Sequence, residues 1–197
     1  MFKGGQGSTL NVTVKWDGAP ALFCGPHPET GKFFVAKKSL FNKTPKFYHT
    51  NDEIDVDLTG ELAKKFKVAL AEFPKLGMTE ILQGDLMFTD DTSTMDIDGT
   101  KHITFQPNTI LYAVESDSQI GREIQNAKIG IVWHTTYKGN SIDTLSASFG
   151  AKIPGKSSRV WQDDATYRDV SGKANFTASE TVKVTKLLSE AGKQFHR

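Results

Sequence analysis

The chain has 197 residues, of which 38% are hydrophobic and 24% are charged, and its formal net charge is +1. These values are typical of a globular domain with a substantial core, and they exclude a chain that attracts nucleic acid or membrane through its overall charge. The single cysteine, Cys24, excludes an internal disulfide and a zinc site made of several cysteines, and we expect it to be a small buried side chain.

The first forty residues predict a series of strands. Residues 10–14 alternate apolar and polar side chains, as a half-buried strand does. Residues 16–20 contain Asp-Gly and a proline, which predict a turn, and residues 21–25 resume as a strand. A hairpin bend near residues 30–31 then leads into another strand. Lys15 is therefore expected at the end of one strand, just before the next begins.

In the middle of the chain, the spacing of apolar residues changes from that of a strand to that of a helix. Apolar residues at steps of four, four and three predict a helix over residues 58–73: Leu62, Phe66, Leu70 and Phe73. Pro74 and Gly77 are expected to end it. Residues 79–89 are typical of a strand, and the acidic, polar residues 90–99 predict an exposed loop.

The remaining elements follow the same patterns. Residues 103–105 and 110–114 predict two strands, residues 118–127 a short helix, and residues 128–137 a third strand. We expect a turn or short helix over residues 141–148 and irregular structure over residues 150–172. A capping box of Thr177 and Glu180 opens a terminal helix. Together, these elements predict an α+β fold, with antiparallel β-sheets flanked by helices.

The stretch Lys15-Trp16-Asp17-Gly18 has the form K-x-D-G. A lysine has a pKa near 10.4 and becomes nucleophilic only where burial or neighbouring cations disfavour its charged form. Lys37 and Lys38 could supply such cations, Asp17 could orient a ribose hydroxyl or a metal, and Gly18 would let a ligand approach the backbone. The alternative is an ordinary turn, because K-x-D-G arises by chance in roughly one chain in twenty.

Further stretches follow in an order that resembles the covalent nucleotidyltransferases, which include the ATP-dependent DNA ligases, RNA ligases and capping enzymes. "VKWDGAPA" matches their first motif, and Asp85 in "LQGDLMFT" resembles the acid of their third motif. "LYAVES" is similar to an aromatic-rich strand of RNA ligases, where Tyr112 would stack on the purine. With "ITFQPNTILYAV", the whole chain also looks like ligase-like proteins of large tailed phages.

The chain departs from this family pattern at three places. The fourth motif, E-G-x-V-x-K, is matched by "IGIVWH", in which Ile129 replaces the metal-binding glutamate and His134 replaces the lysine. The fifth motif has only loose candidates in Lys152 and Lys156. The arginine that often follows K-x-D-G is missing, and Pro20 stands near its place.

The resemblance implies a nucleotidyltransferase fold, an ATP-grasp-like ligase adenylation domain, over residues 1–155. It implies that Lys15 attacks the α-phosphorus of ATP and forms lysyl-AMP, with Mg²⁺ held by Asp85 or Glu115. The implied nucleotide contacts are these: Trp16, Asp17, Gly18, Lys37, Lys38, Asp85, Tyr112, His134 and Lys152. AMP would pass to a DNA or RNA 5′-phosphate end for strand joining.

Residues 156–197 are expected to be an extension that ends in a helix, without a complete OB-fold, so strand joining would need a separate OB-type or partner domain. We expect no membrane partner, because no run approaches the roughly 20 apolar residues of a membrane span. The N-terminus lacks the apolar core of a signal peptide. These features predict a cytoplasmic protein, in the host cytoplasm if its origin is viral.

Each site residue also has a structural interpretation. Asp85 could be a satisfied buried acid, Tyr112 a core residue, and Glu115 an acid before a helix. His134 could be a strand or core histidine, and the lysines of residues 37–46 a solvated face. Three hypotheses follow: an active nucleotidyltransferase, a catalytically degenerate protein that binds nucleotide or nucleic acid, and a structural phage protein on the same fold.

Overall fold

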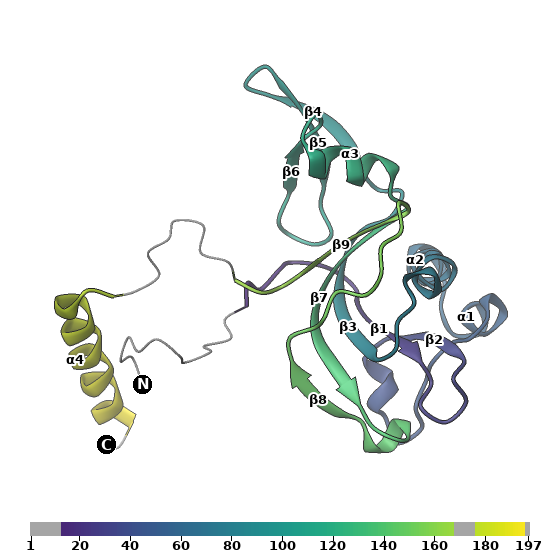
Figure 1. The fold of residues 1–197 in the computed structure, drawn as a ribbon, viewed down its shortest axis with the longest axis horizontal. Coiled ribbons are helices and arrows are strands. Elements are labelled where there is room, and N and C mark those ends of the chain that lie inside the picture. The colour runs from purple at the N-terminus through teal and green to yellow at the C-terminus, as the bar shows by residue number, and fades with distance from the viewer. Residues whose placement is uncertain (1–12, 168–175, 196–197) are drawn as a thin grey trace. The chain divides into compact units, whose positions relative to one another are not determined.

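The computed structural model describes residues 13–167 and 176–195 and confirms an α+β fold with antiparallel sheets (Figure 1). Contacts divide the chain into two units. One spans Thr13–Thr166, and the other includes helix α4 (Ala178–Phe195). The main unit therefore extends past residue 155, where the sequence placed its boundary. The expected strand at residues 10–14 lies mostly outside the described residues.

The larger sheet has the order β2-β1-β3-β7-β8. The sixth strand, β9, also pairs with β7. Its strands are β1 (Ala21–Pro26), β2 (Phe33–Ala36), β3 (Ile81–Phe88), β7 (Ile129–Lys138), β8 (Ser146–Phe149) and β9 (Val160–Asp164). The pairings are antiparallel except for the parallel pair β7–β9. The predicted strands β1, β2, β3 and β7 are confirmed. The short helix expected over residues 141–148 is confirmed as η3 (Ile142–Thr144), but strand β8 follows it within that range, and β9 corrects the expectation of irregular structure.

Helices α1 (Asn51–Asp57) and α2 (Gly60–Glu72) pack on one face of this sheet (Figure 1). The predicted helix is confirmed as α2, and it is followed by a 3₁₀ turn, η2 (Phe73–Leu76). The buried ring of Phe66 on α2 shares one core cluster with Leu86 and Trp133 of the sheet. Helix α1 was not predicted, although Thr50 and Glu53 form a capping box at its start.

The smaller sheet has the order β4-β5-β6, with strands β4 (Ser93–Ile97), β5 (Thr100–Phe105) and β6 (Tyr112–Glu115). β4 corrects the expected loop at residues 90–99. Asp98 and Gly99 both have positive φ, as a two-residue hairpin turn requires. Helix α3 (Gln119–Asn126) follows and is capped by Ser118, which accepts a hydrogen bond from the Gly121 N–H.

The second face of the larger sheet carries two hydrophobic clusters with polar residues between them. One contains Met87, Val132 and Trp161 and packs against the smaller sheet and α3. The other contains Phe23 and Ile81 and lies near the short helices η1 (Lys38–Phe41) and η3 (Ile142–Thr144). The strand registers place Ala21, Asp85, Val132 and Asp163 in one row across this face.

The terminal helix α4 confirms the last predicted element. Thr177 and Glu180 form the expected capping bonds: the Glu180 N–H donates to the Thr177 hydroxyl, and the Thr177 N–H donates to the Glu180 carboxylate. Among the described residues, no helix combines the length and the apolar content that crossing a bilayer would require.

Candidate functional site

The Lys15–Gly18 loop lies directly against β3. The Ala19 N–H donates to the Leu86 carbonyl (2.9 Å), and the Leu86 N–H donates to the Pro20 carbonyl (3.1 Å). A Cβ at Gly18 would come within 2.5 Å of Asp85 Cβ and 2.9 Å of the Leu86 carbonyl oxygen. Only glycine therefore allows the loop to lie this close to the strand. The structure thus brings the Lys15–Gly18 loop and Asp85 together from distant parts of the chain.

Asp17 anchors this loop to the connection between β5 and β6. Its carboxylate accepts hydrogen bonds from the Thr109 hydroxyl (2.7 Å), the Thr109 and Ile110 N–H groups (2.6 and 2.8 Å) and the Asn108 amide (2.9 Å). The bond from the Thr109 hydroxyl, followed by the Ile110 N–H, holds the pKa of Asp17 well below its usual range. Four protein donors thus occupy the carboxylate that was expected to meet a ribose or a metal.

An Asp17→Asn variant is expected to unfold at lower temperature than the wild type, because an amide presents one acceptor where four donors converge. The folded pKa of Asp17 is depressed, so its stabilisation is fully present above the unfolded pKa of about 3.9 and is lost as the pH falls through the folded value. Urea unfolding should give a constant difference between the proteins from pH 8 to 5 and a shrinking difference below pH 4. A difference that stays constant down to the most acidic pH would contradict this role.

Aromatic rings form a column that begins in the same loop. Trp16 stacks on Tyr112 (centroids 5.5 Å apart), and Tyr112 stacks on Phe105 (5.4 Å). The column continues through Phe88 to Trp161 at centroid distances of 5.1 and 6.1 Å. Tyr112 thus already stacks on two protein rings, and its predicted stacking on a purine stays a prediction. Trp16 is half-buried at the end of the column and is the ring that could receive a base.

Asp85 and His134 approach each other on the second face of the larger sheet. Their Oδ1 and Nε2 atoms are 3.7 Å apart, and His134 Nδ1 lies 2.8 Å from the Thr135 hydroxyl. Gly84 pairs with Trp133 and Gln83 with Thr135, so His134 is the extra residue of a β-bulge. Such a bulge redirects a side chain. The resemblance placed both residues in one site, and the structure brings them together.

Ile129 is turned away from this pair. It is fully buried in the cluster that contains Phe66 and Trp133, on the face covered by α2. The position at which the family pattern has a metal-binding glutamate is therefore part of the helical core.

One of the predicted phosphate-binding lysines, Lys37, is paired with a carboxylate. The Lys37 ammonium lies 3.5 Å from Asp57 at the end of α1, and Asp57 also accepts hydrogen bonds from Lys46 and Tyr48. The bond from Lys46, followed by that from Tyr48, lowers the pKa of Asp57 to about 2. Lys38 is exposed at the start of η1, and Lys152 is exposed beside Glu80 and Gly77.

Glu115, the second predicted metal ligand, is an exposed residue of β6 and faces His102 across the smaller sheet. It therefore lies in a different sheet from Asp85. Within residues 13–167 and 176–195, no group of three or more His, Cys, Asp or Glu side chains is placed to hold a metal ion. A magnesium site would consequently rest on Asp85 and on oxygen atoms that a ligand brings with it.

Lys15 itself is exposed. The Val14 N–H donates to the Ala165 carbonyl (2.8 Å) and Thr13 bridges to Thr166, so Lys15 follows a short strand-like pairing next to the end of β9. Within the described part of the chain, its ammonium makes no hydrogen bond or ion pair. Lys15 is thus not buried in this structure, and a bound ligand would have to cover its amine.

The whole chain, residues 1–197, matches the model of a family of unknown function, DUF6267. The chain belongs to this family. No curated protein and no solved structure matches it. Because membership of DUF6267 carries no activity with it, the function has to be argued from the residues themselves.

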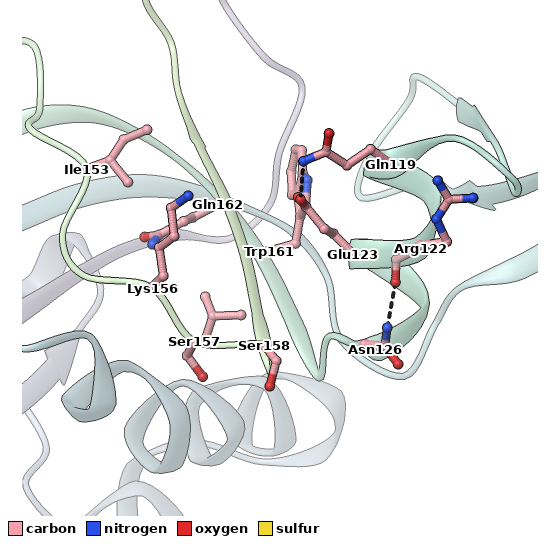
Figure 2. A pocket seen from close by; sticks show the side chains of 11 residues that line it. Gln119, Arg122, Glu123, Asn126, Ile153, Lys156, Ser157, Ser158, Trp161 and Gln162 are labelled. Carbon is pink, nitrogen blue, oxygen red and sulfur yellow. Dashed lines mark hydrogen bonds between the residues drawn. The ribbon is translucent and has the colours of Figure 1, made fainter.

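This DUF6267 member also contains a pocket that the sequence interpretation missed. It has a volume of about 570 Å³ and lies between α3 and residues 153–162 (Figure 2). Lys156, Ser157 and Ser158 line one side of it, and Trp161 lines it as well. A signal was present in the sequence, because residues 150–157 have the form G-x-x-x-x-G-K-S.

Proposed function

We propose that this protein is an ATP-dependent nucleotidyltransferase of the polynucleotide ligase type, which forms lysyl-AMP at Lys15 and transfers AMP to a nucleic-acid 5′-phosphate end. The observation that supports this most is the contact between the Lys15–Gly18 loop and β3 at Asp85, with His134 next to Asp85. Three stretches that the resemblance assigns to one site meet there, although they are far apart in the sequence.

In the proposed reaction, the deprotonated Lys15 amine attacks the α-phosphorus of ATP, a P–N bond forms, and the bond to pyrophosphate breaks. A 5′-phosphate oxygen then displaces the lysine from phosphorus, and a 3′-hydroxyl displaces AMP. Trp16 would stack on the base, and His134 would donate to a phosphate oxygen when protonated. Asp85 suits Mg²⁺, which is commonly bound by one or two carboxylates plus substrate phosphates. The ion would neutralise charge on the leaving group.

Incubation with α-labelled ATP and Mg²⁺, followed by denaturing electrophoresis, tests the proposal. We expect a labelled band in the wild type and in Lys152→Ala, which removes an exposed lysine elsewhere on the same unit. The band should fall below detection, by at least about 10³-fold, in Lys15→Ala and Lys15→Arg, because neither side chain can act as the nucleophile. Equal labelling of the Lys15 variants and the wild type would refute the proposal.

A second candidate function is binding of nucleotide or nucleic acid without catalysis. Two observations favour it: Ile129 is buried in the helical core, and the Lys15 amine is exposed. This function predicts no covalent label, but a higher melting temperature with ATP that is lost in Trp16→Leu. Labelling at Lys15 would exclude it.

A further inference from the structure

We propose that the pocket between α3 and residues 153–162 binds a nucleotide through its phosphate groups, at a site separate from Lys15. The pocket volume of about 570 Å³ lies within the range of small-molecule sites. This inference does not depend on the proposed function, because it uses neither the Lys15–Gly18 loop nor Asp85.

The sequence on one side of the pocket is typical of phosphate-binding loops. Gly150, Gly155, Lys156 and Ser157 satisfy the pattern G-x-x-x-x-G-K-[ST], in which backbone N–H groups, a lysine and a hydroxyl meet phosphate. At average residue frequencies this pattern occurs by chance in about one chain in a hundred of this length, so it is more specific than K-x-D-G. As in such loops, a strand, β8, precedes it.

The structural context after the loop differs from that of P-loop enzymes. Residues 157–160 form a turn that leads into β9, and no helix follows Ser157 directly. Phosphate would therefore be bound by the lysine, the hydroxyls and the loop N–H groups, without a helix N-terminus behind it. We accordingly assign nucleotide binding, but not nucleotide hydrolysis, to this pocket.

The loop is held in place from three sides. The Gly155 N–H donates to the Leu76 carbonyl (2.8 Å), and a Cβ at Gly155 would come within 2.7 Å of the same oxygen. The Gln162 amide donates to the Gly155 carbonyl (2.8 Å) and accepts from the buried Trp133 indole (2.9 Å). The Arg159 guanidinium donates to the buried carboxylate of Glu72 (3.0 Å). A loop that is fixed before binding loses little conformational entropy when a ligand arrives.

The donors that face the pocket are not used elsewhere in the described structure. The Lys156 ammonium and the Ser158 hydroxyl have no hydrogen-bond or ion-pair partner among the described residues. The Ser157 hydroxyl accepts from the Arg159 N–H (3.3 Å), which leaves its own proton free to be donated. Within the described chain, the N–H groups of Lys156 and Ser158 donate no backbone hydrogen bond. A phosphate would satisfy several of these donors at once.

The other side of the pocket carries an indole and a carboxylate, so the pocket favours a nucleotide over free phosphate. Figure 2 shows Lys156 on one side of Trp161 and Glu123 on the other. Glu123 accepts from the Gln119 amide through one oxygen (3.0 Å), and the second oxygen is available for a ligand donor. An ammonium with hydroxyls, an indole and a carboxylate match the three parts of a nucleotide: phosphate, flat base, and ribose hydroxyl or base N–H groups.

Calorimetric titration of the full chain with ATP, tripolyphosphate and adenosine tests this site. We expect ATP to bind more tightly than tripolyphosphate, and adenosine to bind at least about 10-fold more weakly than ATP. Lys156→Ala should weaken ATP binding about 10-fold or more, because a hydrogen bond to a charged group is lost. Lys43→Ala is the control, because Lys43 is an exposed lysine outside this loop. Glu123→Ala should weaken ATP binding but not tripolyphosphate binding.

Several results would overturn this inference: ATP affinity that is unchanged in Lys156→Ala, adenosine that binds as tightly as ATP, or no binding of ATP to the wild type. Loss of the reversible binding in Lys15→Ala would assign the nucleotide to the other loop. Thermal unfolding shows whether each variant is folded, and Ser158→Ala provides a second, smaller change at the same wall. If ATP binding depends on Lys156 but no covalent label forms, this site is supported and only the proposed transferase activity is refuted.

Discussion

Valine in place of Gly18 is expected to lower the melting temperature and to abolish labelling at Lys15. A Cβ there would lie 2.5 Å from Asp85 Cβ and 2.9 Å from the Leu86 carbonyl oxygen, so the loop would have to lift away from β3. Overlap of this kind with backbone costs about 3 kcal/mol of stability. The displaced loop would also shift the Lys15 amine relative to Asp85, so we expect the chemistry to fail in molecules that remain folded.

Differential scanning calorimetry and the labelling assay measure both effects on the same preparation. Gly192→Ala is a suitable control, because Gly192 lies in α4 with nothing near its missing side chain. Alanine also favours helix over glycine, so this control should melt at the wild-type temperature or slightly above it. A Gly18→Val protein that melts like the wild type and keeps its label would show that the close approach to β3 is not required.

Removal of the Phe88 ring is expected to cost about 3–5 kcal/mol of unfolding free energy. Phe88 is fully buried and joins Phe105 to Trp161 in the aromatic column. Gly130 lies against the same ring, and a Cβ at Gly130 would come within 2.5 Å of Phe88 Cζ. Gly130→Ala should therefore destabilise the wild type by about 2 kcal/mol through overpacking.

The two substitutions should compensate each other, because Phe88→Ala removes the atoms that the new methyl group would strike. Urea unfolding of the wild type, both single variants and the double variant gives their interaction energy. We expect the double variant to lose at least about 1 kcal/mol less than the sum of the two single losses. Strict additivity would mean that the ring and Gly130 do not pack as described.

Much of the fold follows from local pattern. The apolar run of residues 21–25 reflects a buried strand, the apolar spacing of residues 58–73 reflects burial on one face of a helix, and both elements are confirmed. β4 and β9 do not have this pattern. β4 is exposed along nearly its whole length, and β9 ends in polar residues. Both strands exist because a neighbour pairs with them, through a two-residue turn for β4 and alongside β7 for β9.

The surroundings of the candidate site could not be predicted from local sequence pattern either. The residue types of Lys15, Asp17 and Asp85 suggested a chemistry, but their surroundings depend on long-range contacts. The donors around Asp17 come from the β5–β6 connection, and Tyr112 is covered on one face by Trp16. No local pattern could predict these contacts. Lys37 was predicted near Lys15, whereas Asp57 in the unexpected helix α1 pairs with it.

Mass spectrometry of the protein after incubation with ATP and Mg²⁺ tests the central claim most directly. The proposal predicts a mass increase of one AMP group, removed by mild acid as a phosphoramidate is, and assigned by peptide mapping to Lys15. Addition of excess pyrophosphate should reverse it, because the step regenerates ATP. An unmodified protein, or AMP attached to another residue while Lys15 stays free, would contradict the claim.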